Sequence, residues 1–516
     1  MNFSTSDIEH IESLGLSLEQ VNNQLEHYKS PPAYVNLKAS ATIGNGIVKL
    51  SKSEFNDLNC FYEEQKTLLR IVKFTPASGA ASRMFKMLHQ FLFDYDPQKE
   101  SINSYINKNK ITELFLFFVT IEKLPFHDEA VAKMRMMVRD YDLLTLDQRR
   151  LLFVKTVLQE SYLNYSNIPK GLLPFHKYKN HISTAFEEHL FEAAKYASVN
   201  GQAILHFTIT KTHLQQFESK LAAIQKSVEA KTNTKFEITF SNQESNTNVL
   251  AVDLKNQPFI LKDKLVFRPS GHGALIKNLN QIDADIIFIK NIDNVVVDKY
   301  LDEIARYKKV LAGMLLKIQN QVFSYAETLE SKVVTKNQIK EIASFLTQNL
   351  NIVITSQFEK YANKHKIEYL KSKINRPIRV CGMVKNENEP GGGPFWIKYD
   401  NGEVSLQIVE ASQVNKSLNH QKAILTNATH FNPVDIVCGV KNYKGEAYDL
   451  EQFVDFNTYF VTTKTKYGRK LKTLERPGLW NGSMADWNTV FVEVPIITFN
   501  PVKTLNDLLK FTHQVK

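Results

Sequence analysis

Cysteine is scarce in this chain, and long apolar runs are missing. Three cysteines occur among 516 residues, at Cys60, Cys381 and Cys438, and no two of them form a C-x-x-C pair. This spacing excludes a disulfide framework and a local zinc motif. The most apolar short run, residues 114–121, is far shorter than the roughly 20 residues of a membrane-spanning helix. Because the first residues also lack the basic start and apolar core of a signal peptide, we expect a cytoplasmic protein with no membrane partner.

Strong charge of one sign is also missing. Lys and Arg total 64 and Asp and Glu total 54, so the formal net charge of +10 is spread over a long chain. Nucleic-acid binding needs a clustered basic face, so we expect no nucleic-acid partner, whereas a site for phosphorylated small molecules agrees with a modest basic excess. The hydrophobic fraction of 43% and charged fraction of 23% are ordinary for globular proteins. Since domains commonly contain about 100–200 residues, one large elaborated domain or two to three domains remain.

The N-terminal segment is dominated by helical spacing. Ser6 with Glu9, and Ser17 with Gln20, have the spacing of capping boxes. We therefore predict a helical N-terminal region over residues 1–66.

Strands and helices alternate through the rest of the chain. Apolar runs predict strands at residues 69–74, 203–210, 235–241, 265–268 and 285–289, and helical spacing predicts helices near residues 213–229, 274–281 and 300–372. Such alternation is typical of an α/β protein with a mostly parallel sheet. We predict one elaborated domain over residues 67–516, with a helical insertion at about 96–200 and a strand-rich part at about 376–516.

The loop from Ala77 to Lys86 is the first candidate site. Neither a Walker loop nor a G-x-G-x-x-G fingerprint is present in the chain, but the small residues of this loop let the backbone approach a ligand. Ser82 can cap the helix that follows, whose N-terminus would attract anions. Arg83 and Lys86 are three apart and would share a helix face, where they could hold a triphosphate. The alternative is an ordinary strand-to-helix turn with surface basic residues.

The second candidate is the segment from Arg268 to Gly273, which lies between a predicted strand and a predicted helix. Two glycines flank His272 and would present the imidazole and bare backbone to a bound group. The alternative is a structural turn that contains a hydrogen-bonded histidine.

The third candidate is Asp293, within Asn291-Ile292-Asp293-Asn294. It follows the apolar strand at residues 285–289, and the carboxyl ends of such strands are where open α/β sheets bind ligands. A single carboxylate there suits Mg²⁺, which typically takes one or two carboxylates plus substrate phosphates. The alternative is an Asx turn.

The fourth candidate is Lys503, within the segment Phe499 to Leu509. It follows an apolar stretch and a proline, and as a flexible point charge it could reach a phosphate. The alternative is a surface lysine in front of a helix.

A fifth stretch contains Lys385, the triplet Gly391-Gly392-Gly393 and the strand Leu406 to Val414. In this order, the five segments resemble the motifs of the UDP-sugar pyrophosphorylases, which are the UDP-glucose and UDP-N-acetylhexosamine uridylyltransferases. The resemblance includes that family's P-x-G-H-G, N-x-D-N and F-x-P-V-K-T-x-x-D-L-L patterns and is collinear over about residues 68–510.

The resemblance implies a fold and a reaction. The fold is a glycosyltransferase-A-like, Rossmann-like α/β domain, in which helices cover both faces of a mixed, mostly parallel sheet. The enzyme would be a nucleotidyltransferase with Mg²⁺ as cofactor. Its substrates would be a nucleoside triphosphate, with UTP expected, and a sugar 1-phosphate, and its products a nucleoside-diphosphate sugar and pyrophosphate.

The resemblance also implies site residues, position by position. The expected phosphate contacts are the loop residues Ser78, Gly79, Ala80 and Ala81 with the catalytic cations Arg83, Lys86 and Lys503; the nucleoside contacts are Gly271, His272 and Gly273; the substrate contacts are Lys385, Gly392, Glu410, Asn427 and His430; and the metal ligand is Asp293. The base, the sugar and the oligomeric state stay open.

Two departures point to a distant branch of the family. Ala81 replaces a glycine of the family loop, and Ala274 follows where the family often has aspartate. They motivate an alternative function, which is a catalytically inactive nucleotide-sugar-binding or regulatory protein of the same fold. A glycosyltransferase is a third option, but the D-x-D triplet that begins at Asp283 precedes the apolar strand instead of following it.

Two further features each allow two interpretations. The basic run from Lys464 to Arg476 predicts a solvated hairpin or a lid over substrate phosphates. Trp480 and Trp487 predict core and turn residues or a platform for a sugar.

Overall fold

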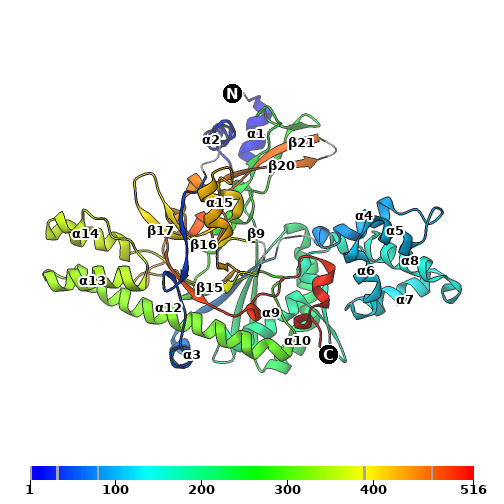
Figure 1. The fold of residues 1–516 in the computed structure, drawn as a ribbon, viewed down its shortest axis with the longest axis horizontal. Coiled ribbons are helices and arrows are strands. Elements are labelled where there is room, and N and C mark those ends of the chain that lie inside the picture. Colours follow the sequence, from blue (N-terminus) through cyan, green and yellow to red (C-terminus); the bar gives the residue numbers. More distant parts are fainter. Residues whose placement is uncertain are drawn as a thin grey trace. The chain divides into compact units, whose positions relative to one another are not determined.

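The computed structural model describes residues 3–30, 34–77, 79, 81–387, 391–466 and 469–515. The chain forms two compact units, and each is assembled from segments that are distant in sequence (Figure 1). Unit 1 consists of Met1–Phe74, Ser241–Lys290 and Arg306–Thr498, and unit 2 consists of Thr75–Phe240, Asn291–Ala305 and Phe499–Lys516. The domain division predicted from the sequence stays a prediction.

A mixed sheet forms the centre of unit 1. In spatial order its strands are β2 (Thr42–Ile43), β3 (Gly46–Val48), β22 (Asn488–Glu493), β15 (Ile378–Lys385), β19 (Asp435–Gly439), β14 (Ile286–Lys290) and β4 (Ile71–Pro76). Along this described path every neighbouring pair is parallel except the two pairs that β19 forms. The α/β class with a mainly parallel central sheet is therefore confirmed.

Strand β14 shows why the apolar run near residue 285 becomes the middle of this sheet. Its residues Ile-Ile-Phe-Ile-Lys are all buried. Ile286 pairs with Ile71 of β4 on one side and with Gly439 of β19 on the other. A strand with neighbours on both edges and both faces covered is expected to be a nearly continuous apolar run, and the first four residues of β14 show this pattern.

The remaining elements of unit 1 include a second sheet and several helices. The second sheet is antiparallel and contains β1 (Leu37–Ser40), β16 (Gly393–Lys398) and β17 (Val404–Val409). The helices are α1 (Thr5–Ser13), α2 (Leu18–Lys29), α3 (Lys52–Gln65), α11 (Ile276–Asn280), α12 (Leu301–Glu330), α13 (Lys336–Asn349), α14 (Asn363–Ile374) and α15 (Asn419–Thr426). Shorter strands are β10 (Val249–Leu250), β11 (Ile260–Leu261), β12 (Lys264–Leu265), β13 (Phe267–Arg268) and β18 (His430–Phe431).

The N-terminal region of unit 1 contains three short strands as well as the predicted helices. The capping box of Ser17 and Gln20 is confirmed at the start of α2. The box predicted for Ser6 and Glu9 is wrong, because Ser4 and Asp7 form it two residues earlier. Helices α1 and α2 then pack their apolar side chains on residues of β10 and β12 and on Leu474.

The basic run near residue 464 forms an antiparallel hairpin of β20 (Phe460–Lys466) and β21 (Arg469–Glu475), so the predicted hairpin is confirmed. Lys464 makes an ion pair with Glu475 across the hairpin at 3.0 Å.

Unit 2 combines a helical cluster with strands and two longer helices. The cluster contains α4 (Lys86–Asp94), α5 (Ile102–Asn109), α6 (Thr112–Val119), α7 (His127–Met137) and α8 (Leu146–Leu158), drawn in blue and cyan in Figure 1. It is followed by β5 (Pro174–Lys177), β6 (Ile182–Thr184), α9 (Ala185–Tyr196), β7 (Ser198–Val199), β8 (Gln202–Ile209), α10 (Leu214–Thr232) and β9 (Lys235–Asn242). Within the predicted insertion at about 96–200, short 3₁₀ turns and the β5–β6 pair separate α8 from α9.

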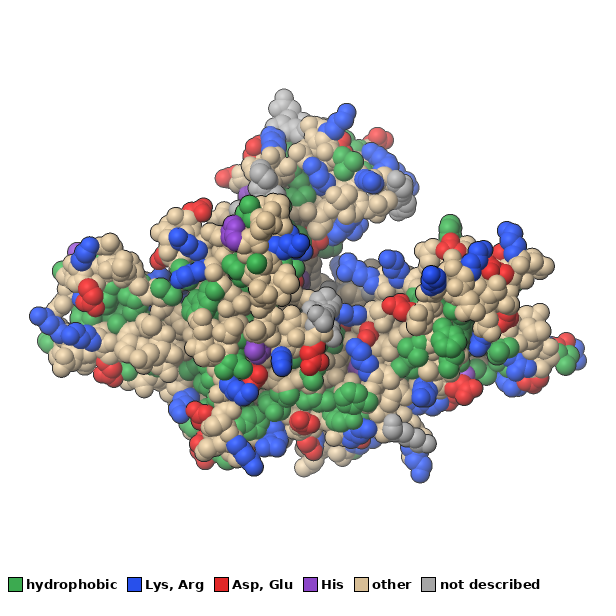
Figure 2. Space-filling view, viewed as in Figure 1, with side chains coloured by type: hydrophobic (Ala, Val, Ile, Leu, Met, Phe, Trp, Pro, Cys, Tyr) green, Lys and Arg blue, Asp and Glu red, His purple; other side chains and the backbone are tan. Residues whose placement is uncertain are grey.

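Surface charge is mixed on the visible face of the protein. Figure 2 shows Lys and Arg side chains interspersed with acidic ones over that face. In the part of the chain that the structure describes, no helix combines the length and the apolar character needed to cross a bilayer. The cytoplasmic location stays a prediction.

Candidate active site

Unit 2 gathers four distant segments around Lys170. This lysine begins a 3₁₀ turn (Lys170–Leu172), and its backbone N–H donates to the carbonyl oxygen of Gly79 at 3.2 Å. Its Nζ donates to Oδ2 of Asp293 at 2.8 Å and to the carbonyl oxygen of Val502 at 2.7 Å. We call Gly79, Ala81, Lys170, Asp293 and Val502 together the Lys170 site.

Backbone hydrogen bonds hold the small-residue loop against this turn. The N–H of Ala81 donates to the carbonyl oxygen of Ile168 at 3.1 Å, and the N–H of Ala77 donates to that of Thr208 at 2.8 Å. Two of the predicted loop contacts, Ser78 and Ala80, lie outside the described residues. Of the predicted loop, Gly79 and Ala81 are therefore placed at the Lys170 site.

The helix predicted to begin at Ser82 is wrong in its start. Ala81–Arg83 forms a 3₁₀ turn, and α4 begins only at Lys86, with Phe85 at its N-cap and no side-chain cap. The hydrogen bond from Ala81 to Ile168 fixes the turn in this conformation, so a tertiary contact overrides the local cap. Arg83 and Lys86 are consequently not neighbours on one α-helical face.

Arg83 and Lys86 nevertheless line one hollow of about 430 Å³. Both side chains are exposed, and within the described ranges neither has an ion-pair partner. The hollow is also lined by Thr504, Leu505 and Asn506, which directly follow Lys503. Unpaired cations beside an open hollow can neutralise a bound anion without first breaking an ion pair.

Lys503 follows directly after the Lys170 site. Its backbone N–H donates to Oδ2 of Asp507 at 2.9 Å, and its exposed Nζ lies 5.5 Å from the centroid of the Phe499 ring. Burial alone would raise the pKa of Asp507, but the Lys510 ammonium and the Thr504 N–H hold it below its usual range. The carboxylate thus caps the turn while the Lys503 side chain extends into solvent.

Asp293 has one oxygen in an ion pair and a partly exposed side chain. Its side chain is 17% exposed, and Lys170 occupies Oδ2. The N–H of Asn294 donates to the carbonyl oxygen of Asn291 at 3.2 Å, so the segment is also a turn. No cluster of three metal-ligating side chains occurs among the described residues. A lone carboxylate fits Mg²⁺ when substrate phosphates and water complete the coordination, and it fits zinc or calcium poorly.

Sequence reasoning missed Lys170. Its ion-pair partner is 123 residues away and its carbonyl partner 332 residues away. One signal was available, because Pro169 and Gly171 flank the lysine and Pro169 is a break in the helical spacing of the predicted insertion. A Cβ at Gly171 would lie 3.0 Å from Cγ1 of Ile292, so the glycine permits the close approach of this turn to the Asp293 segment.

Unit 1 contains the predicted nucleoside contacts, and packing explains both of their glycines. Gly271 has φ +82°, a left-handed conformation that favours glycine. A Cβ at Gly273 would collide with the carbonyl oxygen of Pro477. The glycines are thus required by the fold of unit 1, whether or not a ligand binds.

His272 has a fixed ring orientation and a defined tautomer. Its Nδ1 accepts a hydrogen bond from the N–H of Leu479 at 3.0 Å, and its ring stacks on Trp480 with centroids 4.2 Å apart. Burial lowers the pKa of His272 to about 4, so at neutral pH the ring is neutral. Because Nδ1 accepts, the proton is on Nε2, which can act as a donor. Trp480 and Trp487 are buried, which confirms their interpretation as core residues.

The predicted sugar contacts also lie in unit 1, and most of them are neighbours. Lys385 of β15 pairs with His430 of β18. A Cβ at Gly392 would lie 2.9 Å from Oε1 of Glu410, and the carbonyl oxygen of Gly392 accepts from the N–H of Asn432 at 2.7 Å.

Two of these positions have specific surroundings. His430 is buried beside Glu493, and burial lowers the pKa of its ring despite that carboxylate. Asn427 is exposed at the C-terminal end of α15.

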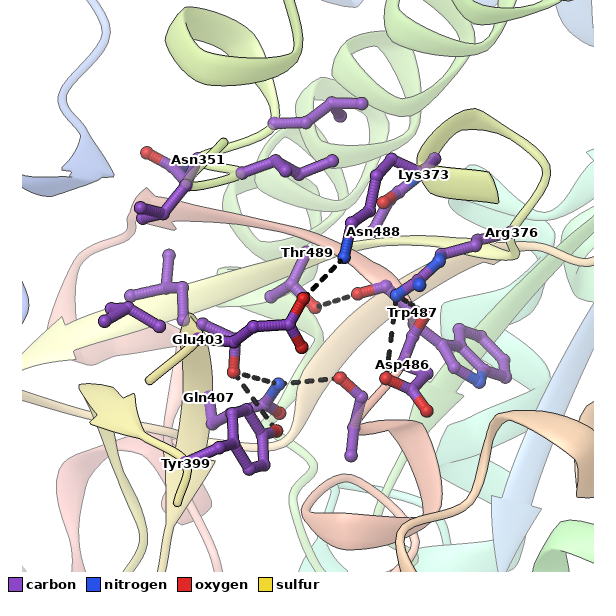
Figure 3. A pocket seen from close by; sticks show the side chains of 17 residues that line it. Asn351, Lys373, Arg376, Tyr399, Glu403, Gln407, Asp486, Trp487, Asn488 and Thr489 are labelled. Atoms are coloured by element: carbon purple, nitrogen blue, oxygen red, sulfur yellow. Dashed lines mark hydrogen bonds and ion pairs between the residues drawn. The ribbon is translucent and has the colours of Figure 1, made fainter. Parts of the chain in front are cut away.

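A further hollow in unit 1 is lined by side chains that satisfy one another. It is lined by 17 residues, among them Glu403, Lys373, Arg376 and Asp486. Lys373 pairs with Glu403 at 3.4 Å, and Arg376 pairs with Asp486 at 3.6 Å, as the dashed lines in Figure 3 show. The volume is about 100 Å³, so this hollow is too small for a nucleotide.

The protein thus has a mixed α/β fold, and unit 2 contains Lys170, the Asp293 carboxylate and the small-residue loop. In structure the chain is similar to UDP-N-acetylglucosamine pyrophosphorylase from Trypanosoma brucei (TM-score 0.47, 11% identity, 95% of this chain and 74% of that chain). It is also similar to UDP-glucose pyrophosphorylase from Leishmania major, with a TM-score of 0.44 and 11% identity over 98% of this chain and 79% of that chain. A third similar structure is UDP-glucose phosphorylase from Trypanosoma brucei, with a TM-score of 0.43 and 13% identity over 98% of this chain and 77% of that chain.

Sequence comparison then places the chain in a family. No curated protein matches the sequence. The model of the family described as a domain of unknown function, DUF4301, matches residues 4–514. The chain therefore belongs to the DUF4301 family.

Proposed function

We propose that the protein is a nucleotidyltransferase that joins a nucleoside triphosphate, with UTP expected, to a sugar 1-phosphate. An oxygen of the sugar 1-phosphate forms a bond to the α-phosphorus, and the bond from that phosphorus to the pyrophosphate oxygen breaks in line. The products are a nucleoside-diphosphate sugar and pyrophosphate. The observation that carries the proposal is the Lys170 site. There the backbone N–H of Lys170 binds the small-residue loop at Gly79, and its ammonium binds the Asp293 carboxylate and the carbonyl oxygen of Val502, which directly precedes Lys503.

The proposed reaction needs charge neutralisation more than proton transfer. A phosphate monoester is already largely ionised at pH 7, because its second pKa is near 6, so the attacking oxygen needs no protein base. Catalysis then consists of positioning and of stabilising charge on the transferred phosphate and on pyrophosphate. Arg83, Lys86 and Lys503 are proposed for these contacts, with Lys170 as a fourth cation.

Asp293 is the proposed ligand for Mg²⁺. The ion would supply additional positive charge beside the phosphates, a common function of Mg²⁺ in phosphoryl transfer. Lys170 holds one oxygen of the Asp293 carboxylate at 2.8 Å and thereby fixes the orientation of the group.

The segments in unit 1 are proposed to bind the nucleoside and the sugar. The Nε2–H of His272 can donate to a carbonyl or hydroxyl oxygen, and Gly271 and Gly273 are the proposed backbone contacts on either side. The proposed contacts of the sugar phosphate are Lys385, Gly392, Glu410, Asn427 and His430.

A matrix of nucleoside triphosphates and sugar 1-phosphates, scored by pyrophosphate release, tests the proposal. We expect release with at least one pair, and a loss of about 10²–10³-fold in Lys503→Ala, by analogy with the removal of one charge-stabilising contact. The matched control is Lys444→Ala, which removes an exposed lysine of unit 1. Absence of release with every pair, or unchanged turnover in Lys503→Ala, contradicts the proposal.

A binding protein without catalysis is the second candidate, and one observation favours it. The carboxylate proposed for the metal is already paired with an ammonium, as expected of a site that holds nucleotide phosphates by lysine alone. Isothermal titration with UTP, with and without Mg²⁺, separates the candidates. Binding that does not depend on Mg²⁺, together with no pyrophosphate release, supports the second candidate.

A further inference from the structure

Buried side chains of unit 2 form a chain of hydrogen bonds that ends on the segment carrying Lys503. Oε1 of Glu188 lies 2.8 Å from Nδ1 of His176, and Nε2 of His176 lies 2.9 Å from Nδ1 of His513. Nε2 of His513 lies 3.0 Å from the carbonyl oxygen of Asn500. All three side chains are buried, and none belongs to the Lys170 site.

The direction of every hydrogen bond in this chain follows from the carbonyl oxygen of Asn500, which is the acceptor at its end. A carbonyl oxygen only accepts, so Nε2 of His513 carries a proton. Burial, reinforced by the neighbouring His176, lowers the pKa of His513 to about 3, so this ring is neutral and its Nδ1 is a bare acceptor. His176 must therefore donate from Nε2.

The contact between His176 and Glu188 then contains one shared proton. With Nε2 of His176 protonated, the 2.8 Å contact at Nδ1 needs a proton on either the ring or the carboxyl group. Both arrangements carry one proton and no net charge. Without that proton, a lone pair would face a buried carboxylate, which is strongly unfavourable.

Neighbouring groups complete this network. The hydroxyl of Tyr178 donates to Oε1 of Glu188 at 3.1 Å and accepts from the N–H of Asp298 at 3.1 Å. Burial and the Glu188 carboxylate raise the pKa of Tyr178, which keeps its proton. The charged groups that influence His513 are Asp507 and Lys510, and their effects on its pKa are opposite.

The segment at the end of this chain is fixed on both sides. The N–H of Asn500 donates to Oδ1 of Asn294 at 2.7 Å, while its carbonyl oxygen accepts from His513. The N–H of Val502 donates to the carbonyl oxygen of Asp293 at 3.2 Å, and its carbonyl oxygen accepts from Lys170. Lys503 thus follows a short backbone stretch whose position depends on His513 at one end and on Lys170 at the other.

Helix α9 supports the two halves of the Lys170 site with consecutive residues. Glu188 acts on residues 499–513 through the two histidines. The next residue, His189, is fully buried and makes a 3.1 Å hydrogen bond from Nε2 to the carbonyl oxygen of Ile292, which directly precedes Asp293.

We propose that Glu188, His176 and His513 are positioning residues whose shared proton docks residues 499–513 and thereby places Lys503. The docking is independent of any reaction. Its consequence for turnover rests on the proposed nucleotidyl transfer.

Hydrogen–deuterium exchange of the whole chain tests the docking directly. In His513→Phe the ring volume is kept but both nitrogens are lost, and we expect exchange of the Asn500 and Val502 amides to rise at least tenfold. Glu188→Ala should have the same effect. Glu188→Gln keeps an amide donor toward Nδ1 of His176, and we expect it to restore protection of both amides.

The matched control is His206→Phe. His206 is another buried histidine of unit 2; burial lowers its pKa to about 4, and its Nδ1 contacts Oγ1 of Thr239 at 2.8 Å. This variant should leave exchange at residues 499–513 unchanged. In an active enzyme, His513→Phe should lower kcat by about 10–100-fold with little change in KM, since misplacement of a catalytic group by about 1 Å has effects of this size.

The outcomes separate the two proposals. Unchanged exchange at residues 499–513 in both His513→Phe and Glu188→Ala overturns the docking, whatever the activity. Equal losses of protection in Glu188→Gln and Glu188→Ala overturn the shared proton. Raised exchange in the two disruptive variants and restored protection in Glu188→Gln support the docking, even if the parent protein releases no pyrophosphate, a result that counts against the proposed function alone.

Discussion

His272 lies nearly flat against Trp480, with the two ring planes inclined by 18°. Nδ1 of the ring accepts from the backbone N–H of Leu479, so Nε2 is the only donor of the neutral ring. A histidine in a candidate binding motif therefore also acts as a structural residue of unit 1. Any test of its contribution to binding must separate these two functions.

Stability should decrease when the pH falls below about 6.5. Burial lowers the pKa of His272 to about 4 and that of His513 to about 3, from 6.5. The unfolded chain then binds more protons than the folded one, so the stability from these neutral rings is complete above about pH 6.5 and is lost as the pH falls. Urea unfolding between pH 7.5 and 5 measures this slope.

The slope should be smaller in His272→Gln. The exposed His89 supplies the control, since His89→Gln should leave the slope as in the parent protein. Identical slopes in the parent and in His272→Gln would contradict a lowered pKa.

Lys170→Ala should strongly lower the proposed activity with little effect on the fold of unit 1. It removes a cation from the Lys170 site and leaves the Asp293 carboxylate without its partner, so we expect a loss of about 10²–10³-fold in kcat. Lys170→Arg keeps the charge and should recover part of the rate. Pyrophosphate release measures both variants.

Lys235→Ala is the control for this prediction, because it removes an exposed ion pair of unit 2, between Lys235 and Glu229 at 2.7 Å. Surface pairs contribute only about 0–1 kcal/mol, so turnover should not change. Equal turnover in Lys170→Ala and Lys235→Ala would show that Lys170 has no function in catalysis.

Asp293→Asn should change the response of the protein to Mg²⁺. The amide keeps the shape of the carboxylate but not its charge, so the Mg²⁺ concentration for half-maximal rate should rise about tenfold or more. UTP binding without metal should be retained, because Lys170 loses a competing anion. A rate series against Mg²⁺ concentration and a metal-free UTP titration measure the two effects, and unchanged curves in both would exclude Asp293 as a metal ligand.

Two glycine variants should have opposite consequences. Gly273→Ala puts a methyl group against the Pro477 carbonyl oxygen, and we expect a loss of about 1–3 kcal/mol in unfolding free energy.

In Gly79→Ala the new methyl group meets no atom within 4 Å, so the stability of this variant should match that of the parent. Its nucleotide affinity should fall if the loop approaches phosphates closely. Thermal unfolding and UTP titration separate the two, and a stable Gly273→Ala variant would show that the Pro477 segment can move.

Local patterns predicted most of the elements but not the groups that meet across them. The apolar run of β14 and the turn at Asn291 to Asn294 are visible in the sequence, because a strand buried on both faces is expected to be a nearly continuous apolar run. The cap at Ser82 was predicted wrongly, since the Ala81–Ile168 hydrogen bond is a tertiary contact with no local signal. The contacts of Lys170 and His513 give no local signal either, because each binds a side chain more than 100 residues away in the sequence.

The use of residues 499–513 in unit 2 has a consequence for synthesis of the chain. A ribosome makes Gly79, Lys170 and Asp293 long before Val502, and domains generally fold in the order in which they emerge. The carbonyl that binds Lys170 and the ring that binds Asn500 are both made after the other groups of the Lys170 site. Nascent chains that stop before residue 499 should therefore have an incomplete Lys170 site, and closure of unit 2 becomes a late step that depends on non-local contacts, which form slowly.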